Sequence, residues 1–358
     1  MEHKEIDESN KEITFIGSLP PPIGGETVKN SIFIEALESK NVKLNTINIL
    51  MSKVYVLKCL LKLFFKEDKY LIMSLSSRAR LFFIPYAFFL IKINNYRVIF
   101  LPIGGKIYDE IDNMPSPIKK LFIRFLDEFD QIYVESKQLK KEMNDTLNYD
   151  IVSYLPNFKK KPDEVSKVFR GVDNRLELVY LGRMAKDKGI FDLLNAFDIL
   201  KDDTDIELHF YGTFPKNDAL KKKFQKKIER EEKIIHHGYL SDEKLIETLS
   251  DHHVFVFPTY HEGECFPGVL LDAFFSGLPV IASDWRFNSE IVEDGKNGLL
   301  CEPRDPKDLA EKIRRLYGDE ELLKYMSKNA FEMSEKYDVD NVIDGLLDDL
   351  VEFGWFNQ

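Results

Sequence analysis

Short apolar runs that alternate with helical patterns most constrain how this chain folds. Residues 13–17 (ITFIG) and 176–181 (LELVYL) read as buried strands, and each is followed by a loop with glycines and then by a helical pattern. A strand, a loop and a helix in this order form the first unit of a doubly wound α/β domain. The alternation continues through both halves of the chain. We therefore predict an α/β fold with two Rossmann-like domains, each a doubly wound parallel sheet, that face a central cleft.

The stretch from residue 258 to residue 285 begins at the end of one apolar strand pattern and ends after a second. Glu264 lies in its loop, and Asp272 is the only charge on the helical pattern of residues 268–276. An unpaired carboxylate on an apolar helix is costly to bury, so Asp272 needs either water or a partner. We expect Glu264 and Asp272 to face one pocket, next to a helix N-terminus that attracts anions. For either acid alone, simple complementation of the helix macrodipole is the alternative.

A second pattern opens the C-terminal half of the chain. Residues 182–189 (GRMAKDKG) follow the strand pattern of residues 176–181 and precede a helical pattern. Arg183 and Lys188 therefore lie just before a helix N-terminus. Two cations together with the amides of a helix start suit a diphosphate.

These two patterns resemble the motifs of a known family. ECFPGVLLDA resembles the E-x(7)-E motif of retaining family 4 glycosyltransferases (glycosyltransferase group 1), with Asp272 where the family usually has glutamate. Residues 182–189 resemble the family's G-R-x(4)-K-G, and SGLPVIASD resembles its G-x-P-V-I strand. The family has the GT-B fold and uses nucleotide sugars. The resemblance implies a retaining hexosyltransferase that moves a sugar from a nucleotide diphosphate sugar, most often a UDP-sugar, to a hydroxyl.

The resemblance also implies roles for individual residues. Arg183 and Lys188 would neutralise the leaving diphosphate and Glu264 would bind hydroxyls of the donor sugar, so we take these three as catalytic. The residues expected to bind the donor are Gly24, Gly25, Gly182, Gly212, Tyr239, Phe266, Gly268, Val269 and Asp272. Retention is usually pictured as same-face attack assisted by the leaving phosphate, so no protein nucleophile is required. No histidine lies between residues 4 and 208, so the histidine that many relatives use is missing and no general base is named.

Neither a metal nor another cofactor is required by this interpretation. Two D-x-D patterns, at residues 203–205 and 338–340, are interpreted as solvated surface. Three cysteines cannot all pair and show no metal-ligand spacing, which favours a reducing cytoplasm. The net charge of −11 argues against binding to nucleic acid.

The domain boundary is predicted near residue 160. Residues 1–12 are polar and acidic, which indicates a solvated tail and not a signal peptide. Residues 155–158 (LPNF) resemble the sequence that closes the N-terminal domain in the family, and a charged linker follows. We therefore predict an acceptor-side domain at residues 13–160 and a donor domain at residues 161–339. The fold implies that a last helix, at residues 340–358, crosses back to the first domain.

Two groups of residues in the N-terminal half are candidates for the acceptor side. Arg78 and Arg80 follow a strand pattern at residues 70–74, and Gly104, Gly105 and Lys106 form a glycine-rich turn after another. Arginines at a strand end bind an anionic acceptor or a phosphate well. Solvated arginines at the start of a helix are an equally good interpretation.

Residues 53–106 are basic and apolar, with 10 Lys+Arg against 2 Asp+Glu. Lys58, Lys62 and Lys66 form one stripe of a helical pattern, and residues 82–93 read as a buried helix. Such a segment suits an anionic membrane, and core elements with solvated lysines explain it equally well. The longest apolar run, residues 81–91, is too short to span a bilayer. We expect a cytoplasmic protein, any membrane contact being peripheral, with a saccharide or lipid-linked saccharide as acceptor in cell-surface polysaccharide synthesis.

Two other functions stay open. A GT-B nucleotide-sugar epimerase has the same architecture, although such enzymes are not expected to carry both motifs. A non-catalytic, glycosyltransferase-like binding subunit would explain Asp272 and the missing histidine. Transfer or hydrolysis by the purified chain separates these alternatives.

Overall fold

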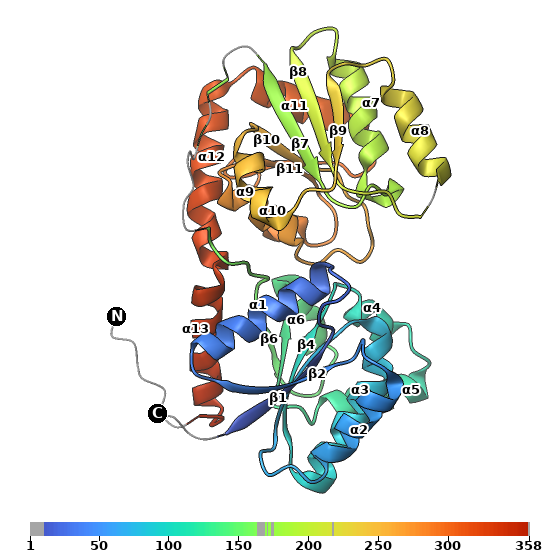
Figure 1. Cartoon of the computed structure of the whole chain (residues 1–358), viewed down its shortest axis with the longest axis vertical. Helices are drawn as coiled ribbons and strands as arrows, with labels where there is room; N and C mark the ends of the chain where they lie inside the picture. Colours follow the sequence, from blue (N-terminus) through green and yellow to red (C-terminus); the bar gives the residue numbers. More distant parts are fainter. Residues whose placement is uncertain (1–10, 163–168, 170, 173–174, 217, 357–358) are drawn as a thin grey trace. The chain divides into compact units, whose positions relative to one another are not determined.

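The computed structural model describes residues 11–162, 169, 171–172, 175–216 and 218–356. These residues form two compact units. The first unit runs up to Lys160 and includes the chain from Asp338 onward, and the second is Lys161–Tyr337. Each unit contains its own six-stranded sheet (Figure 1).

The first unit contains an all-parallel sheet in the order β2-β1-β3-β4-β5-β6. The strands are β1 (Glu12–Gly17), β2 (Lys43–Asn48), β3 (Tyr70–Leu75), β4 (Arg97–Pro102), β5 (Gln131–Val134) and β6 (Val152–Tyr154). The helices are α1 (Gly25–Ser39), α2 (Lys53–Leu63), α3 (Ser77–Asn94), α4 (Ile107–Asp112), α5 (Ser116–Leu126), α6 (Lys137–Asn144) and α13 (Val339–Glu352).

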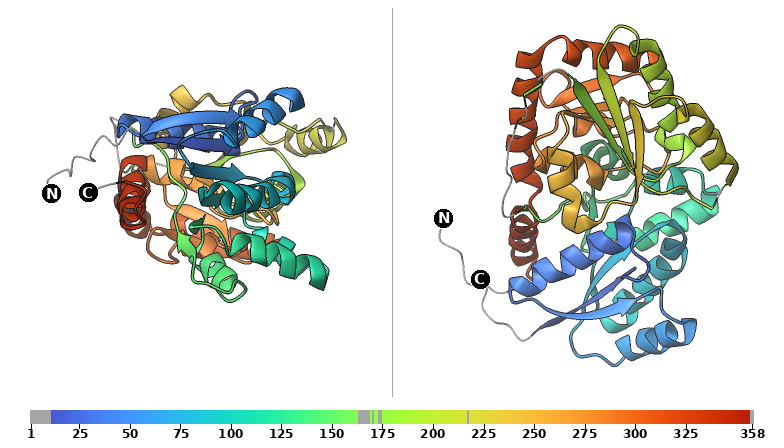
Figure 2. Two further views of the ribbon diagram at one scale, coloured as in Figure 1. Left: turned by 90° about the horizontal axis from the view of Figure 1, so that it is seen from below. Right: turned by 45° about the horizontal axis from the view of Figure 1, so that its top comes forward.

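Helices cover both faces of this first sheet (Figures 1 and 2). Phe15 of β1, Phe33 of α1 and Ile343 of α13 belong to one buried cluster, so α1 and α13 pack on the same face. The last helix therefore lies in the core of the first unit, although it follows the second unit in sequence. Helices α2, α3 and α5 lie together on the opposite side, where Tyr86 of α3 donates to the carbonyl of Leu60 in α2 at 2.7 Å.

The second unit contains another all-parallel sheet, in the order β12-β11-β10-β7-β8-β9. The strands are β7 (Leu176–Leu181), β8 (Ile206–Tyr211), β9 (Ile234–Gly238), β10 (Val254–Phe257), β11 (Val280–Ser283) and β12 (Gly298–Cys301). The α-helices are α7 (Ile190–Leu200), α8 (Asp218–Ile228), α9 (Asp242–Ser250), α10 (Gly268–Phe275), α11 (Pro306–Tyr317) and α12 (Glu320–Ser334). Short 3₁₀ turns are η1 (Lys186–Lys188), η2 (Asn288–Glu290) and η3 (Glu335–Tyr337).

Both faces of this second sheet are buried, as the nearly continuous apolar strands require. Leu178 of β7 packs in a cluster with α7 and α11, whereas its neighbour Val179 packs in a cluster with α9 and α10. Successive side chains of a strand point to opposite faces, so each strand contributes to two cores. The prediction of two Rossmann-like parallel-sheet domains is confirmed.

Two details of the first unit differ from the sequence prediction. Helix α2 ends at Leu63, and Lys66 lies beyond it, where its ammonium contacts Glu12 at 2.7 Å and the Thr14 hydroxyl at 2.9 Å. Lys66 is therefore not part of a lysine stripe with Lys58 and Lys62. Residues 82–93 were predicted as a buried helix, yet α3 buries one side only. An 18-residue helix on a single sheet face has no second layer to cover its outer side. In the part of the chain that the structure describes, no helix has both the length and the apolar character needed to cross a membrane.

Candidate active site

The loops that follow three neighbouring strands of the second sheet are hydrogen-bonded to one another. Gly182, after β7, donates its amide to Tyr211 at 3.0 Å, and Gly212, after β8, donates to Gly238 at 2.6 Å. A Cβ on Gly212, where φ is +140°, would lie 1.8 Å from the carbonyl oxygen of Gly182. Only glycine allows this approach. The contact sets the start of the loop that carries Arg183 and Lys188.

The end of that loop packs against the loop that follows β10. Gly189 has φ +73°, and a Cβ there would lie 2.0 Å from the carbonyl oxygen of Pro258. The amide of Tyr260 donates to the carbonyl of Asp187 at 2.8 Å. The two motif-bearing loops are thereby joined along their backbones.

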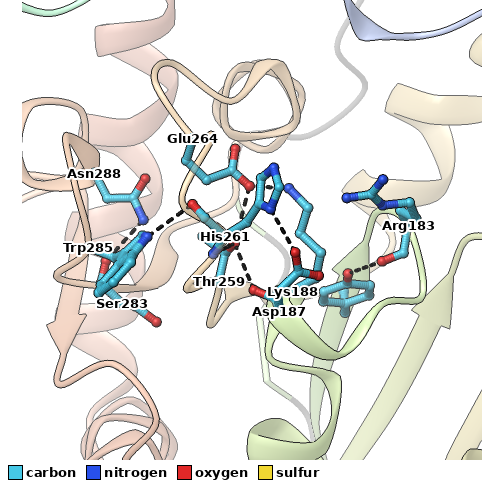
Figure 3. A network of polar contacts seen from close by, with 10 residues as sticks. Arg183, Asp187, Lys188, Thr259, His261, Glu264, Ser283, Trp285 and Asn288 are labelled. Carbon is cyan, nitrogen blue, oxygen red and sulfur yellow. Dashed lines mark hydrogen bonds and ion pairs between the residues drawn. The ribbon is translucent and has the colours of Figure 1, made fainter. Parts of the chain in front are cut away.

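This backbone contact brings Lys188 and Glu264 together, 76 residues apart in sequence (Figure 3). The Lys188 ammonium forms an ion pair with the Glu264 carboxylate, which also accepts a hydrogen bond from the Thr259 hydroxyl at 3.1 Å. Glu264 is only 8% exposed. A carboxylate buried to this degree is costly unless it is paired and hydrogen-bonded, and both conditions are met here. Two of the three predicted catalytic residues thus form one unit.

Arg183 differs from Lys188 in its surroundings. Its side chain is exposed, and among the described residues its guanidinium makes no ion pair. Its backbone is fixed, because the hydroxyl of Tyr180 donates to the Arg183 carbonyl at 2.9 Å. Burial raises the pKa of Tyr180 far above its ordinary value, so this phenol stays protonated and remains a donor. The chain therefore presents one exposed cation beside one that is already paired.

Helix α10 begins directly after the Glu264 loop. Gly268 is its first residue, Pro267 precedes it without an N–H, and Val269 is half-buried. Phe266 is buried with its ring edge on Tyr337, at 5.1 Å between centroids, which fixes the start of the helix. The helix N-terminus carries a positive partial charge that favours an anion.

Asp272 and Tyr239, the other two expected donor-binding side chains, lie in contrasting surroundings. Asp272 lies in the second turn of α10 and is 3% exposed. Tyr239, in the turn after β9, is 68% exposed. A ring exposed to this extent offers a face on which a planar base can stack.

A third contact joins these loops, and no motif in the sequence predicts it. The His261 ring nitrogen Nδ1 lies 2.7 Å from the Asp187 carboxylate, and the indole N–H of Trp285 donates to the His261 carbonyl at 3.0 Å. Asp187 is one of the unspecified positions of the G-R-x(4)-K-G pattern, and His261 precedes the acids of the next motif. Neither position has a signature of its own, so adjacency to a motif was the only signal.

An open pocket of about 490 Å³ lies beside this contact and is lined by Lys186, Asp187, Asp192, Tyr260 and Arg304. The Arg304 guanidinium stacks over the Tyr260 ring at 4.5 Å. Burial raises the pKa of Asp192, and the nearby Arg304 and Lys186 partly oppose the shift. Charges of both signs therefore line this pocket.

The candidate residues of the first unit divide into open and buried positions. A Cβ on Gly24 or Gly25, at the start of α1, would meet nothing within 4 Å, so the backbone there is open to a ligand. Arg78 is exposed in the first turn of α3.

The interpretation of Arg80 as a solvent-facing arginine is wrong, since its side chain is only 2% exposed. Its guanidinium donates to the carbonyls of Leu75 and Ile103 and to the Glu110 carboxylate. Arg80 thereby holds the turn of Gly104, Gly105 and Lys106 from inside the unit. Because Gly104 has φ +85° in this turn, the chain can reverse there.

Metal-ligating side chains do not gather in the part of the chain that the structure describes: no group of three or more His, Cys, Asp or Glu is arranged to hold an ion. In the first D-x-D pattern, Asp205 contacts Arg175 at 3.1 Å and Lys233 at 3.0 Å. Exposed ion pairs of this kind are ordinary surface features.

Comparison with known proteins matches residues 162–333 to the family described as Glycosyl transferases group 1. The chain is 29% identical over 192 residues to the sulfoquinovosyl transferase of Arabidopsis thaliana, covering 53% of this chain and 36% of that protein. It is 28% identical over 164 residues to the capsular polysaccharide biosynthesis glycosyltransferase CapM of Staphylococcus aureus, covering 46% and 42%. The chain thus spans less than half the length of these curated relatives.

Among solved structures, Anabaena HepE in complex with UDP superposes with a TM-score of 0.74 at 15% identity, covering 96% of this chain and all of that one. An identity this low establishes the fold alone. The chain as a whole therefore has the two-domain GT-B fold, and residues 162–333 match the model of the family described as Glycosyl transferases group 1.

Proposed function

We propose that this protein is a retaining glycosyltransferase that moves a sugar from a nucleotide diphosphate sugar, a UDP-sugar in the first instance, to a hydroxyl of a saccharide or lipid-linked saccharide. The observation that carries the proposal is the Lys188–Glu264 ion pair beside the exposed Arg183. The group 1 match of residues 162–333 and the UDP complex of HepE support the choice of donor. The name of the relative CapM supports a role in polysaccharide synthesis.

The proposed chemistry assigns one task to each charged group. When the bond to the sugar breaks, negative charge develops on the nucleoside diphosphate, and Arg183 and Lys188 would stabilise that charge. A diphosphate that engages Lys188 releases Glu264, whose carboxylate then accepts hydrogen bonds from hydroxyls of the sugar. The amides at the start of α10, near Gly268, add to the positive field, and Asp272 would bind the ribose. This scheme needs neither a metal nor a protein nucleophile.

The proposal places the protein in the cytoplasm, with peripheral contact at the cytoplasmic face of a membrane where lipid-linked acceptors are found. The acceptor-side residues under this proposal belong to the first unit. Arg78 is the exposed candidate for contact with an acceptor, whereas Gly104 and Lys106 are half-buried and Gly105 is buried, and Arg80 would act by positioning their turn.

A thermal-shift panel of UDP, GDP, ADP and their sugar conjugates tests the donor site. A ligand that binds only the folded state stabilises it by about 2.7 kcal/mol at a hundredfold excess over Kd. Arg183→Ala is the sharpest variant, because the side chain is exposed and makes no ion pair with any residue that the structure describes, so we expect its loss to leave the fold intact. Arg315→Ala, an exposed arginine on α11 of the same unit, is the matched control. We expect a shift with one nucleotide that persists in Arg315→Ala and is reduced in Arg183→Ala.

Transfer itself separates this proposal from its alternatives. Nuclear magnetic resonance of the anomeric proton of the product, with the purified chain and a donor identified in the panel, reports whether the configuration is retained. A product with the inverted anomeric configuration would exclude the retaining mechanism. Donor binding without transfer or hydrolysis would favour a non-catalytic binding subunit, and conversion of the donor into its epimer would favour an epimerase.

A further inference from the structure

The outer side of the first unit carries large apolar side chains in ordered stripes. On α2, Val54, Leu57 and Leu61 are spaced by three and four residues, which places them on one face of the helix, and Phe65 follows in the turn after it. Each is more than half exposed, and Phe65 reaches 89%. Leu60 and Leu63, on the other side of α2, fill the core. The helix therefore has two apolar faces, and only one of them is used by the fold.

Helix α3 repeats this arrangement. Leu81, Phe82, Phe89 and Ile93 are each more than half exposed, and at 100° per residue they fall on the side opposite the buried Ile84, Ala87 and Leu90. Helix α5 adds Ile118 and Leu121, both at least half exposed. The three helices are neighbours: α3 bonds to α2 through Tyr86, and its Phe88 ring lies 4.7 Å from that of Phe125 on α5. We refer to these exposed residues of α2, α3 and α5 as the outer apolar face.

The charges on the same three helices all have one sign. Helices α2, α3 and α5 each contain three Lys or Arg and no Asp or Glu, in a chain whose net charge is −11. Lys58 and Lys62, one turn apart, border the α2 stripe and make no ion pair among the described residues. Lys92 and Lys119 have acidic partners in neighbouring segments, Glu128 and Asp112, and the guanidinium of Arg80 is buried. Exposed cations without an ion pair among the described residues lie on all three helices: Lys53, Lys58 and Lys62 on α2, Arg78 on α3, and Lys120 and Arg124 on α5.

We propose that the outer apolar face is a docking surface for an anionic lipid bilayer. A helix that lies in the membrane interface buries its apolar side among the acyl chains, while its lysines meet anionic headgroups. In that arrangement the apolar side chains of α2, α3 and α5 would contact the acyl chains, and Lys58 and Lys62 would contact the headgroups. A second copy of the chain fits less well, because a self-contact would set like charges opposite one another. Binding to the bilayer requires neither donor nor acceptor. Only one consequence of the binding rests on the proposed function, namely that sugar transfer takes place at the membrane surface.

Flotation of the full chain with vesicles of phosphatidylglycerol and phosphatidylcholine, and with vesicles of phosphatidylcholine alone, tests the proposal. We expect strong flotation with the anionic vesicles. Lys58→Gln with Lys62→Gln should weaken binding roughly 30-fold, since each lysine near an anionic surface contributes about 1 kcal/mol. Leu57→Gln with Leu61→Gln should remove the part of the binding that persists at high salt. The substituted side chains are exposed, so circular dichroism and thermal unfolding are expected to match those of the parent chain.

The matched control is Lys222→Gln with Lys226→Gln on α8 of the second unit. These lysines are exposed, and replacing them removes the same two positive charges. Among the described residues, α8 has no large apolar side chain that is exposed. Binding by this variant should equal that of the parent chain. An equal loss in the control, or no flotation with anionic vesicles, would overturn the proposal. So would a dimer in light scattering that Leu57→Gln with Leu61→Gln dissociates, since the outer apolar face would then be covered by a second copy. Each of these results leaves donor binding and transfer to a water-soluble saccharide open to separate measurement.

Discussion

The coupling between Lys188 and Glu264 is the most direct test of the site. Their side chains are 16% and 10% exposed, and the Thr259 hydroxyl supplies one more hydrogen bond to the carboxylate. Removing one partner of a buried pair costs about 3–5 kcal/mol, because the other charge is left uncompensated. With some solvent access and the Thr259 bond retained, we expect Lys188→Met to lower the free energy of unfolding of the second unit by about 3 kcal/mol. Lys188→Met with Glu264→Gln replaces both charges by neutral groups of similar size and should cost only about 1 kcal/mol.

Urea unfolding followed by tryptophan fluorescence measures these differences. Trp285 lies in the second unit and Trp355 in the first, so a Trp355→Phe background makes the signal specific to the second unit. Lys296→Met is the control, since Lys296 forms an exposed pair with Glu293 at 2.7 Å and its loss should leave the midpoint in place. Equal stability of Lys188→Met and the double variant would refute the reasoning, because the two charges would then be uncoupled.

Three further results are expected. Gly189→Ala should lower the free energy of unfolding of the second unit, measured in urea, by more than about 3 kcal/mol, because it combines φ +73° with a Cβ 2.0 Å from the Pro258 carbonyl oxygen. Gly345→Ala is the control: this glycine lies in α13 with open space around its Cβ, so the substitution should be neutral or slightly stabilising. Burial, together with nearby His209, lowers the pKa of His252 to about 3, so between that pH and about 6.5 the unfolded state binds one proton more than the folded state. The free energy of unfolding should therefore fall by roughly 1.4 kcal/mol per pH unit as the pH drops below about 6.5. Thermal melts at several pH values measure this dependence, and His252→Gln should flatten it. Asp305→Ala should cost about 1 kcal/mol in the same melts, because the carboxylate of this N-cap accepts from the amides of Lys307 and Asp308 at the start of α11.

The sequence predicted those parts of the molecule that depend on local patterns. Strands such as β7 and β8 are continuous apolar runs, and a parallel sheet buried on both faces requires such runs. Lys188 and Glu264 each lie in a motif that the sequence displays, and the fold brings the two motifs together. The Asp187–His261 contact and the buried position of Arg80 depend on which loops meet in space, so no spacing in the sequence indicates them. The prediction that α3 is fully buried was wrong for a related reason. Its apolar residues are compatible with burial on every side, but α3 packs on one face of a sheet and no second layer covers its outer side.

The ion pair also bears on how the proposed donor would be distinguished from the released product. A nucleoside diphosphate that engages Lys188 leaves Glu264, at 8% exposure, with the Thr259 hydroxyl as its remaining partner in Figure 3. Sugar hydroxyls restore the lost hydrogen bonds, whereas the nucleoside diphosphate alone does not, and an unsatisfied buried acceptor costs about 1–3 kcal/mol. On the proposed function, a nucleotide sugar should therefore bind more tightly than its nucleoside diphosphate, by roughly tenfold or more. Glu264→Gln should narrow that ratio, because a neutral amide loses less when Lys188 turns to the phosphate. Titration calorimetry of both ligands measures the ratio, and one that stays unchanged in Glu264→Gln would mean that Glu264 does not bind the sugar.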